Sequence, residues 1–405
     1  MSRALSYRRS SSAEIRRKPS LDFSITGLIY TSMMLFMGLA AINSQANLLF
    51  GVFGLMIGVL LVAGWISRTV LRKLEIRRVF PEYMVVGQTA GVQYEFHNQK
   101  RFWPSLSVTV GEVSAPEAFS KQVQAYLLHA AAGTKGLIPT QVIPKTRGLH
   151  QLDKFQLSTS FPFGFIKRAV NRRQTDNIIV YPPLAQVDPK LLTRCMSAEQ
   201  TGARMKPRQG GADEFYGVKE YREGESPRFI YWRRSARTGT LVLKEMTHVA
   251  PPRLLIVVDT FVREHSIANL AAVEKTIAVA ASLISRTIDQ GLAVGLCAWS
   301  GDWRTINPTR GKRHSHELIS LLARLPLNRE HDHRGLLSAA HEMLESGTTP
   351  ILLSPYEVEQ NLSDVSRGNW LMIGANSAQT KQWFKFDSDI QFERCIPPEH
   401  RPAAA

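Results

Sequence analysis

The longest apolar stretch of the chain lies near its N-terminus. No Lys, Arg, Asp, Glu or His occurs from residue 23 to residue 67, and the stretch divides at the polar quartet 43–46. Each half has about 20 residues, which at 1.5 Å rise per residue matches the roughly 30 Å hydrocarbon core of a bilayer. The pattern predicts a transmembrane hairpin with helices over 23–42 and 47–67.

Basic residues flank this apolar stretch on both sides, whereas the turn between the two spans carries no charge. The flanking residues are Arg16, Arg17, Lys18, Arg68, Arg72, Lys73, Arg77 and Arg78. Because Lys and Arg are enriched in cytoplasmic loops, the pattern predicts that both ends face the cytoplasm. A cleaved signal peptide is not expected, since a second full-length apolar segment follows the first. The alternative, a buried hairpin of a soluble protein, would need a much larger helical body to cover it.

After the hairpin, apolar and polar residues alternate in short segments separated by Gly, Pro and Asn. Segments 93–97, 106–110 and 155–159 show this period of two, and turns are expected at 147–148 and 161–164. Alternation at such spacing is typical of strands with one buried face. Residues 74–183 are therefore predicted to form a small β-sandwich-like domain.

The pattern changes again at Arg253, where a continuous apolar run, 254–258, ends in Asp259. Such a run is typical of a parallel strand that is buried on both faces. Helical and strand patterns then alternate, which predicts a parallel sheet covered by helices. The expected helices lie at 270–288 (closed by Gly291), 316–325, 336–344 and 358–365, and the expected strands at 254–258, 292–299, 303–306 (at an edge), 350–353 and 370–373.

These changes divide the chain of 405 residues into six parts. The expected parts are an N-terminal tail (1–22), a transmembrane hairpin (23–67), a β-rich domain (74–183), a connector with a charged segment (188–252), an α/β domain (253–375) and a C-terminal tail (376–405). The predicted fold class is thus multi-domain.

The formal net charge is +16 and the sequence pI is about 9.9. Such an excess suits nucleic acid, anionic lipid or the cytoplasmic flanks of membrane helices, and the total alone does not choose among them. Cys195, Cys297 and Cys395 are odd in number and far apart, so neither a disulfide framework nor a zinc knuckle is expected. A reducing compartment fits this cysteine usage.

Residues 213–245, called the signature segment below, interleave acidic, basic and aromatic residues without helical or strand periodicity. Their order resembles the signature of the domain-of-unknown-function 58 (DUF58) family. The chain departs from the family's pattern at Lys219, Glu225 and Tyr231, where Arg, Asp and Asp are usual, and the last exchange loses a carboxylate. The candidate site residues in this segment are Glu214, Phe215, Lys219, Glu220, Tyr221, Gly224, Glu225, Trp232, Arg233, Arg234 and Arg237.

The resemblance implies an architecture and a set of partners. It extends over a membrane hairpin, a β-rich insert with a Pro-Phe-Gly turn at 162–164 and a Val-Tyr-Pro strand at 180–182, and an α/β domain similar to the von Willebrand factor type A fold. DUF58 proteins are thought to act with MoxR-type AAA+ ATPases in assembling or activating other proteins, and some accompany transglutaminase-like membrane proteins. These are expectations from the resemblance and not from composition.

Type A domains can bind Mg²⁺ through D-x-S-x-S, a Thr and a second Asp, since this ion needs a near-complete set of oxygen ligands. Only Asp259 is clearly present here, and the second acid is replaced in the run Ser354-Pro355-Tyr356. We therefore expect a degenerate site without metal, in which Asp259 caps a helix or pairs with Arg263.

Other catalytic chemistry is not indicated by the sequence either. Five histidines, His314, His316, His331, His333 and His341, lack the i, i+4 pair of a zinc helix. Cys297 lies in an apolar strand, as expected of a packed thiol. Phosphate-loop, dinucleotide and nucleophile-elbow motifs are missing from the sequence. We expect neither an enzyme nor a cofactor.

The leading hypothesis is a membrane-tethered adaptor of the bacterial inner membrane whose cytoplasmic α/β domain binds a MoxR-type AAA+ ATPase. The alternatives are a basic protein that binds nucleic acid or anionic lipid, and a metal-dependent hydrolase using Asp259 and the histidines. The signature segment has two interpretations: its charged and aromatic residues form a partner surface, or Trp232 and Tyr221 pack between domains while Glu220 and Arg237 form an ion pair.

Overall fold

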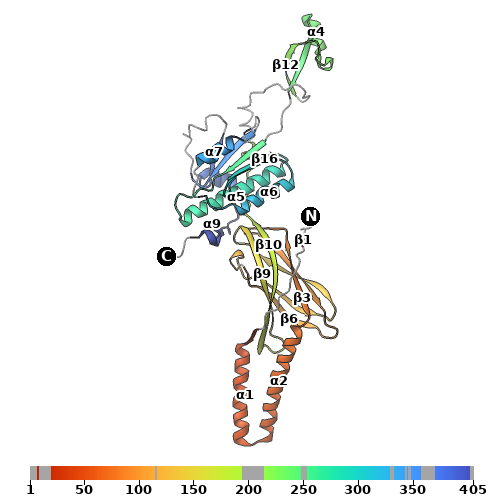
Figure 1. The fold of residues 1–405 in the computed structure, drawn as a ribbon, viewed down its shortest axis with the longest axis vertical. Helices are drawn as coiled ribbons and strands as arrows, with labels where there is room; N and C mark the ends of the chain where they lie inside the picture. The colour runs from red at the N-terminus through yellow and green to blue at the C-terminus, as the bar shows by residue number, and fades with distance from the viewer. Residues whose placement is uncertain are drawn as a thin grey trace. The chain divides into compact units, whose positions relative to one another are not determined.

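The computed structural model describes residues 7–8, 20–114, 116–193, 214–247, 253–328, 333–342, 344, 348–356 and 370–401. The chain is multi-domain and has two compact units. The first comprises residues 1–183 together with 388–405, and the second comprises residues 184–387. Two apolar helices lie near the N-terminus of the first unit, and most strands follow them along the chain (Figure 1).

Two antiparallel helices, α1 (Ile25–Ser44) and α2 (Asn47–Leu71), form the expected hairpin (Figure 1). Both are long and apolar enough to cross a membrane, with mean hydropathy of 1.8 and 2.4. Most of their large apolar side chains are exposed, which is costly in water but favourable in lipid. Helix α5 also has the length and composition of a membrane span, but 72% of its apolar window is buried inside the protein. Its apolar face therefore belongs to a core.

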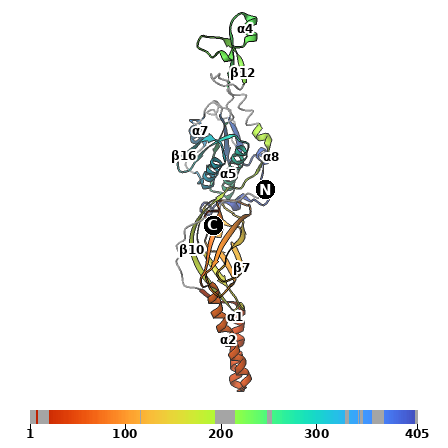
Figure 2. The ribbon, with the colours of Figure 1, turned by 90° about the vertical axis from the view of Figure 1, so that its right-hand side faces the viewer.

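The first unit also contains two mainly antiparallel sheets (Figures 1 and 2). One sheet has the order β1 (Tyr7–Arg8), β3 (Leu74–Pro81), β5 (Ala90–Asn98), β8 (Lys135–Val142). The other has the order β2 (Ser20–Phe23), β10 (Ile166–Tyr181), β9 (Gly148–Thr159), β6 (Ser105–Glu112), β7 (Gln124–Ala130), with β4 (Tyr83–Val85) paired to β10. The alternation in the sequence corresponds to strands whose inner face is buried.

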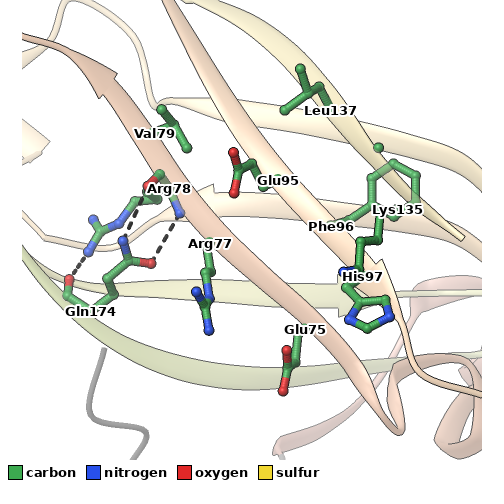
Figure 3. Close-up of a pocket in the computed structure, with 11 residues that line it drawn as sticks. Glu75, Arg77, Arg78, Val79, Glu95, Phe96, His97, Lys135, Leu137 and Gln174 are labelled. Atoms are coloured by element: carbon green, nitrogen blue, oxygen red, sulfur yellow. Dashed lines mark hydrogen bonds between the residues drawn. The ribbon is translucent and has the colours of Figure 1, made fainter. Parts of the chain in front are cut away.

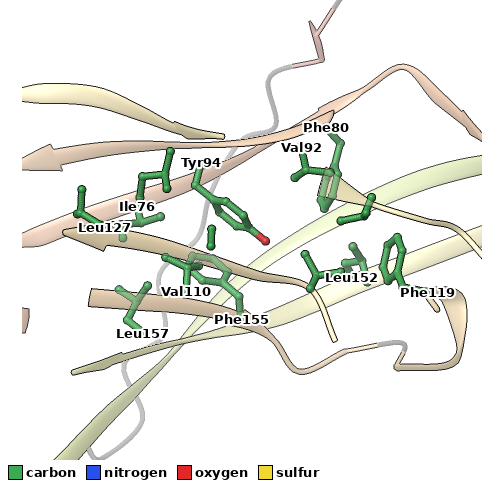
Figure 4. Packing of buried hydrophobic residues seen from close by; sticks show 14 of the residues in the cluster. Ile76, Phe80, Val92, Tyr94, Val110, Phe119, Leu127, Leu152, Phe155 and Leu157 are labelled. Carbon is green, nitrogen blue, oxygen red and sulfur yellow. The ribbon is translucent and has the colours of Figure 1, made fainter. Parts of the chain in front are cut away.

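The two sheets share one apolar core, which makes this part a β-sandwich. Tyr94 of β5 and Phe155 of β9 are among its largest fully buried side chains, and their ring centroids lie 6.4 Å apart (Figure 4). Aliphatic residues from both sheets, such as Val92 and Leu157, surround them. Burial of this apolar surface stabilises the sandwich without specifying a ligand site.

An ion-pair network crosses this core. Arg78 of β3 lies with Nη1 2.8 Å from Glu112 Oε2 on β6, and its Nε lies 3.2 Å from Asp176 Oδ2 on β10. Tyr94 donates a 2.8 Å hydrogen bond to Glu112 Oε1, and Arg78 donates another to the Leu152 carbonyl. Burial raises the pKa of Glu112, while the charge of Arg78 opposes that shift. Arg78 is therefore a core residue and not one of the free charges that flank the second span.

The last part of the chain is structured although it was expected to be a tail. Residues 376–405 contain α8 (Ala378–Trp383), β19 (Phe384–Lys385), α9 (Phe392–Cys395) and a 3-10 turn (Pro398–His400). Within the first unit, Cys395 joins the sandwich core and Ile390 packs against it. Within the second unit, β19 pairs with β11 (Gln186–Val187). These segments are too short to show a periodicity in the sequence.

The second unit contains a five-stranded sheet with the order β16 (Trp303–Thr309), β15 (Ala293–Trp299), β14 (Arg253–Val258), β17 (Thr348–Ser354), β18 (Leu371–Gly374). Strands β15, β14, β17 and β18 are parallel, and β16 runs antiparallel at one edge. The central strand β14 is fully apolar after Arg253 because both of its faces are covered.

Helices cover this sheet in the second unit. α5 (Ile267–Asp289) packs against β14, β15 and β17, and α6 (Lys312–Arg324) packs against α5. α7 (His333–His341) packs in a cluster with Leu255, Val257 and Cys297 on the sheet. Ser266 caps α5, and Gly291, with φ of 78°, follows its end as expected. The helix expected at 358–365 lies outside the described residues.

Candidate functional site

The signature segment folds as a strand pair with a short helix, although its sequence shows no periodicity. β12 (Glu214–Glu220) pairs antiparallel with β13 (Val242–Thr247), and between them lie a 3-10 turn (Pro227–Phe229) and α4 (Trp232–Thr238), as Figure 2 shows. Each element is short, and the pairing shifts register between Phe215 and Gly217, so no single period survives in the sequence.

Lys219 and Glu225, two positions at which the chain departs from the family's pattern, pair with each other. Lys219 Nζ donates a 2.6 Å hydrogen bond to Glu225 Oε1, and the Arg222 backbone N–H donates to the other carboxylate oxygen. These two hydrogen bonds lower the pKa of Glu225. Gly224 adopts φ of 98°, which a residue with a side chain rarely tolerates, and so allows the tight turn. These residues hold the turn after β12.

The next paired residues fix α4 against β13. Ser235 is buried, and its Oγ accepts a 2.8 Å hydrogen bond from the Val242 backbone N–H. The Tyr231 N–H donates to the Val242 carbonyl at 2.8 Å, and Gly239, with φ of 73°, ends the helix. Ser235 was not among the predicted site residues, because one Ser in a basic helix gives no signal of its own.

Tyr231 marks the third departure and occupies the N-cap of α4. Its side chain makes no capping hydrogen bond, whereas an Asp at this position would accept one from the first turn of the helix. The ring instead lies under Lys244, whose Nζ is 4.7 Å from its centroid. The lost carboxylate is thus replaced by a cation–π contact to β13.

The remaining candidates on α4 form an exposed patch. We call Trp232, Arg233, Arg234 and Arg237 the arginine–tryptophan surface; all four are exposed, and Trp232 retains 66% of its accessible surface. None of these arginines makes an ion pair with a residue that the structure describes. The predicted ion pair between Glu220 and Arg237 is not formed.

The other predicted residues of the segment lie on or next to β12. Glu214 and Phe215 occupy the start of this strand, Glu220 ends it with an exposed side chain, and the N–H of Tyr221 donates to the Leu241 carbonyl. Tyr221 is partly buried within the segment. Packing of Tyr221 and Trp232 between domains stays a prediction.

Asp259 lies at the carboxyl end of β14, next to the end of β17. This is where the strand order reverses, the usual place of a ligand crevice in such sheets. The buried carboxylate accepts hydrogen bonds from the Phe261 N–H at 2.9 Å and from Ser354 Oγ at 3.0 Å. Arg263 stacks on Tyr356, with its guanidinium carbon 4.7 Å from the ring centroid. Asp259 therefore joins two strand ends.

Residues 217–349 match the family described as protein of unknown function DUF58. The DUF58 match begins within β12 and ends within β17, so it covers α4, β13 and most of the α/β sheet. Glu214 and Phe215 precede it. No curated protein is significantly similar in sequence to the chain.

The histidine and cysteine side chains that the structure describes within the DUF58 match differ in their surroundings. His314 bonds through Nε2 to the Val294 carbonyl at 2.8 Å, and His341 is exposed at the end of α7. His331 lies outside the described residues, as does Cys195. Cys297 is fully buried, and burial raises the pKa of its thiol to about 12. In the described ranges no three His, Cys, Asp or Glu side chains gather to hold a metal.

The sandwich outside the DUF58 match carries two polar grooves. One, of about 600 Å³, lies over β3, β5 and β8, where Glu75, Arg77, Glu95, His97 and Lys135 alternate in sign (Figure 3). The other, of about 640 Å³, is lined mainly by hydroxyl and amide side chains of β6, β7 and β9. Both are open faces of antiparallel sheets, which are commonly solvated, and neither collects charge of one sign.

Proposed function

We propose that the protein is a membrane-tethered, non-enzymatic adaptor whose DUF58 region binds a partner protein. In this proposal α1 and α2 form a two-pass anchor in the bacterial inner membrane, and the body faces the cytoplasm. The uncharged turn of the hairpin and the Lys and Arg clusters at its two ends support that orientation. The partner that the DUF58 resemblance implies is a MoxR-type AAA+ ATPase, with a transglutaminase-like membrane protein as a further member of the assembly.

The observation that carries this proposal is the arginine–tryptophan surface. Lys219, Glu225 and Ser235 are engaged inside the signature segment, whereas Trp232 and its neighbouring arginines project from a helix that is fixed to β13. Trp and Arg are the residue types that most often dominate binding energy at protein interfaces. Three arginines within six residues favour an acidic partner surface, since guanidinium groups bind carboxylates in bidentate geometry.

Binding of the full-length chain, purified in detergent, to the candidate ATPase tests the proposal. Trp232→Ala is expected to weaken binding about 30-fold, the effect of losing an interface hot spot of about 2 kcal/mol. Arg237→Ala is expected to weaken it less. Arg324→Ala is the matched control, because Arg324 is also an exposed arginine near a helix end, on α6.

Two outcomes would count against this function. Repeated recovery of the protein alone, with the ATPase co-expressed, would contradict the adaptor role. DNA binding that survives about 200 mM salt and is lost in Trp232→Ala would favour the nucleic-acid alternative, since nonspecific phosphate contacts weaken steeply at that salt concentration.

The cytoplasmic orientation has a separate test. Leu149 is an exposed residue of β9 in the sandwich. A Leu149→Cys variant should react with a membrane-impermeant maleimide only after spheroplasts are permeabilised. Labelling of intact spheroplasts would reverse the proposed orientation and leave the anchor itself in place.

A further inference from the structure

Two loops of the sandwich run alongside the helices of the hairpin. The first is the turn between β9 and β10, whose Phe165 carbonyl accepts a 3.1 Å hydrogen bond from the Ser24 N–H. The Phe165 ring stacks on Tyr30 with centroids 4.2 Å apart. A Cβ atom at Gly27 would lie 2.1 Å from the Phe165 oxygen, so this glycine is what allows the close approach.

The second loop connects β5 to β6 and contacts α2. Its Trp103 meets Trp65 edge to face, with centroids 5.6 Å apart. Lys100 of the same loop is buried and donates hydrogen bonds to the carbonyls of Thr69 and Val70, in the last turn of α2. The loop is therefore held firmly along the helix end.

Both loops reach past the helix ends to a similar depth. Tyr30 lies five residues into α1 from Ile25, which corresponds to about 7.5 Å, and Trp65 lies six residues before the end of α2 at Leu71, or about 9 Å. Each position falls inside the uncharged stretch 23–67 that is expected to lie in the membrane. The contact of one loop with Tyr30 on α1 and the contact of the other with Trp65 on α2 thus give the two loops a similar distance from the helix ends.

The tips of these loops carry exposed aromatic side chains. Phe102 retains 78% of its accessible surface, Trp103 50% and Phe163 53%. Single exposed apolar residues are common on soluble proteins. Here they share one level with Trp65 of the membrane helix, and aromatic residues at such a level are typical of the belt at a membrane–water interface.

Arginine side chains lie next to this aromatic level. The guanidinium carbon of Arg101 lies 5.2 Å from the ring centroid of Phe102. Arg68 follows Trp65 by three residues on α2. The Nε of Arg168 on β10 is buried and has no hydrogen-bond partner among the described residues. Helix α2, which carries Arg68, packs against β10. Burial lowers the pKa of Arg168, and the like charge of Arg68 lowers it further. An anion between them would relieve this repulsion.

We propose that the sandwich is partly immersed in the membrane interface: the loops at 101–103 and 161–165 insert aromatic side chains among the lipid headgroups, and Arg68, Arg101 and Arg168 bind anionic phospholipid. The inference rests on the proposed membrane anchor. A bilayer surface is the partner that fits, because the patch is continuous with the lipid-exposed helices and places cations beside the aromatic belt. Anionic lipids attract basic residues near a membrane surface.

Depth-dependent quenching of a fluorophore tests the insertion. In full-length protein with Cys195→Ser, the remaining Cys297 and Cys395 are buried. Single cysteines are then placed at Phe102, Phe163, Leu55 and Leu149 and labelled, and the protein is reconstituted in liposomes that carry a quencher at the headgroup. Leu55 lies on α2, and Leu149, which is 54% exposed, matches Phe163 but lies at the opposite end of β9.

We expect strong headgroup quenching at Phe102 and Phe163, quenching at Leu55 by a quencher deep in the acyl chains, and none at Leu149. If Leu55 is quenched but Phe102 and Phe163 behave like Leu149, the inference is overturned while the anchor stands. If Leu55 is not quenched either, the proposed anchor fails and the inference falls with it.

Quencher-labelled phosphatidylglycerol, compared with the same label on phosphatidylcholine, tests the lipid class. The label at Phe102 should be quenched severalfold more by phosphatidylglycerol, and Arg68→Gln together with Arg168→Gln should abolish this preference. Arg68→Gln alone serves if the double variant does not fold, and Arg77→Gln is the control, since Arg77 is an exposed residue of β3. Equal quenching by the two lipids would overturn the assignment of anionic lipid.

Discussion

Arg78 in the sandwich and the arginines of α4 show opposite uses of one residue type. The Arg78 side chain is fully buried and is bound by Glu112, Asp176 and backbone carbonyls. Arg233 and Arg237 are exposed and make no ion pair with any residue that the structure describes. A buried guanidinium that loses an anionic partner destabilises the fold, because its charge is then uncompensated away from water. An exposed guanidinium without an internal partner is free to bind a carboxylate or phosphate of another molecule.

Because buried and exposed arginines differ in this way, the net charge of +16 does not by itself measure how much charge is available for binding. Arg78 and Lys100 contribute to that total, yet both have partners inside the protein: Arg78 pairs with Glu112 in the sandwich core, and Lys100 binds the Val70 carbonyl at the end of α2. In our two proposals the charges that bind are others, on α4 and beside the loops that contact the hairpin.

Removing the buried arginine should unfold the sandwich most readily. Arg78→Met leaves Glu112 and Asp176 without their cation, and breaking such a buried pair typically costs about 3–5 kcal/mol. Chemical denaturation followed by hydrogen exchange in β5 measures this loss. Arg77→Met is the control, because Arg77 is the exposed neighbour on the same strand and should change stability by less than about 0.5 kcal/mol. A similar loss of stability in both variants would contradict the distinction between a buried, paired arginine and an exposed one.

Lys100→Met should loosen the end of α2. The substitution removes the Lys100 hydrogen bond to the Val70 carbonyl, which keeps the one from Ser105 Oγ, and it leaves buried Ser105 Oγ without its donor, at a cost of about 1–3 kcal/mol. Burial lowers the pKa of Lys100 to about 8 from an ordinary value of 10.5. Between these values the unfolded chain binds more protons than the folded one, so the stability of the wild-type protein relative to Lys100→Met should rise from pH 8 to pH 10.5. If the stability of the wild-type protein relative to Lys100→Met falls from pH 8 to pH 10.5, burial does not lower the pKa of Lys100.

Tyr231→Asp should stabilise α4. The new carboxylate can cap the helix at the position where the tyrosine makes no capping bond, a gain of about 1 kcal/mol that is partly offset by loss of the contact with Lys244. Slower hydrogen exchange at the N–H groups of the first turn of α4 is the measurement. Tyr231→Asn, which caps without a charge, separates the hydrogen bond from electrostatics. Faster exchange in both variants would show that the cation–π contact dominates.

Arg233→Gln and Arg237→Gln should leave folding unchanged. Exposed side chains without partners usually contribute within about 0.5 kcal/mol, so both variants should melt like the wild-type protein. The same variants should weaken partner binding, though less than Trp232→Ala does, which separates function from stability. A large loss of stability would instead assign these arginines a structural role and remove the argument for a binding surface.

The sequence predicted long elements better than short ones. The two spans of the hairpin and the helix at 270–288 are visible because many residues repeat one pattern, and α2 differs only by continuing to Leu71 beyond the expected end. The helices α4, α8 and α9 were missed because a helix of four to seven residues makes fewer than two turns, and the register shift between Phe215 and Gly217 interrupts the alternation in β12.

The candidate site was predictable in its residues but not in its roles. The resemblance identified Lys219, Glu225 and Tyr231 as departures from the DUF58 pattern. Only the structure shows that Lys219 pairs with Glu225, and that Tyr231 occupies the N-cap of α4 without a capping hydrogen bond from its side chain. Arg78 was misjudged because the sequence does not reveal that it meets Glu112 on a distant strand, and Ser235 was not named because nothing in the sequence marks its hydrogen bond to the nearby Val242.

The return of residues 388–401 to the sandwich has a consequence for biosynthesis. Cys395 belongs to the core that β3 to β10 form, although the whole second unit, 184–387, is translated in between. A chain that emerges from its N-terminus therefore makes the whole second unit before it makes the last residues of the sandwich core. The sandwich, the earliest soluble part to be made, is the last to be finished.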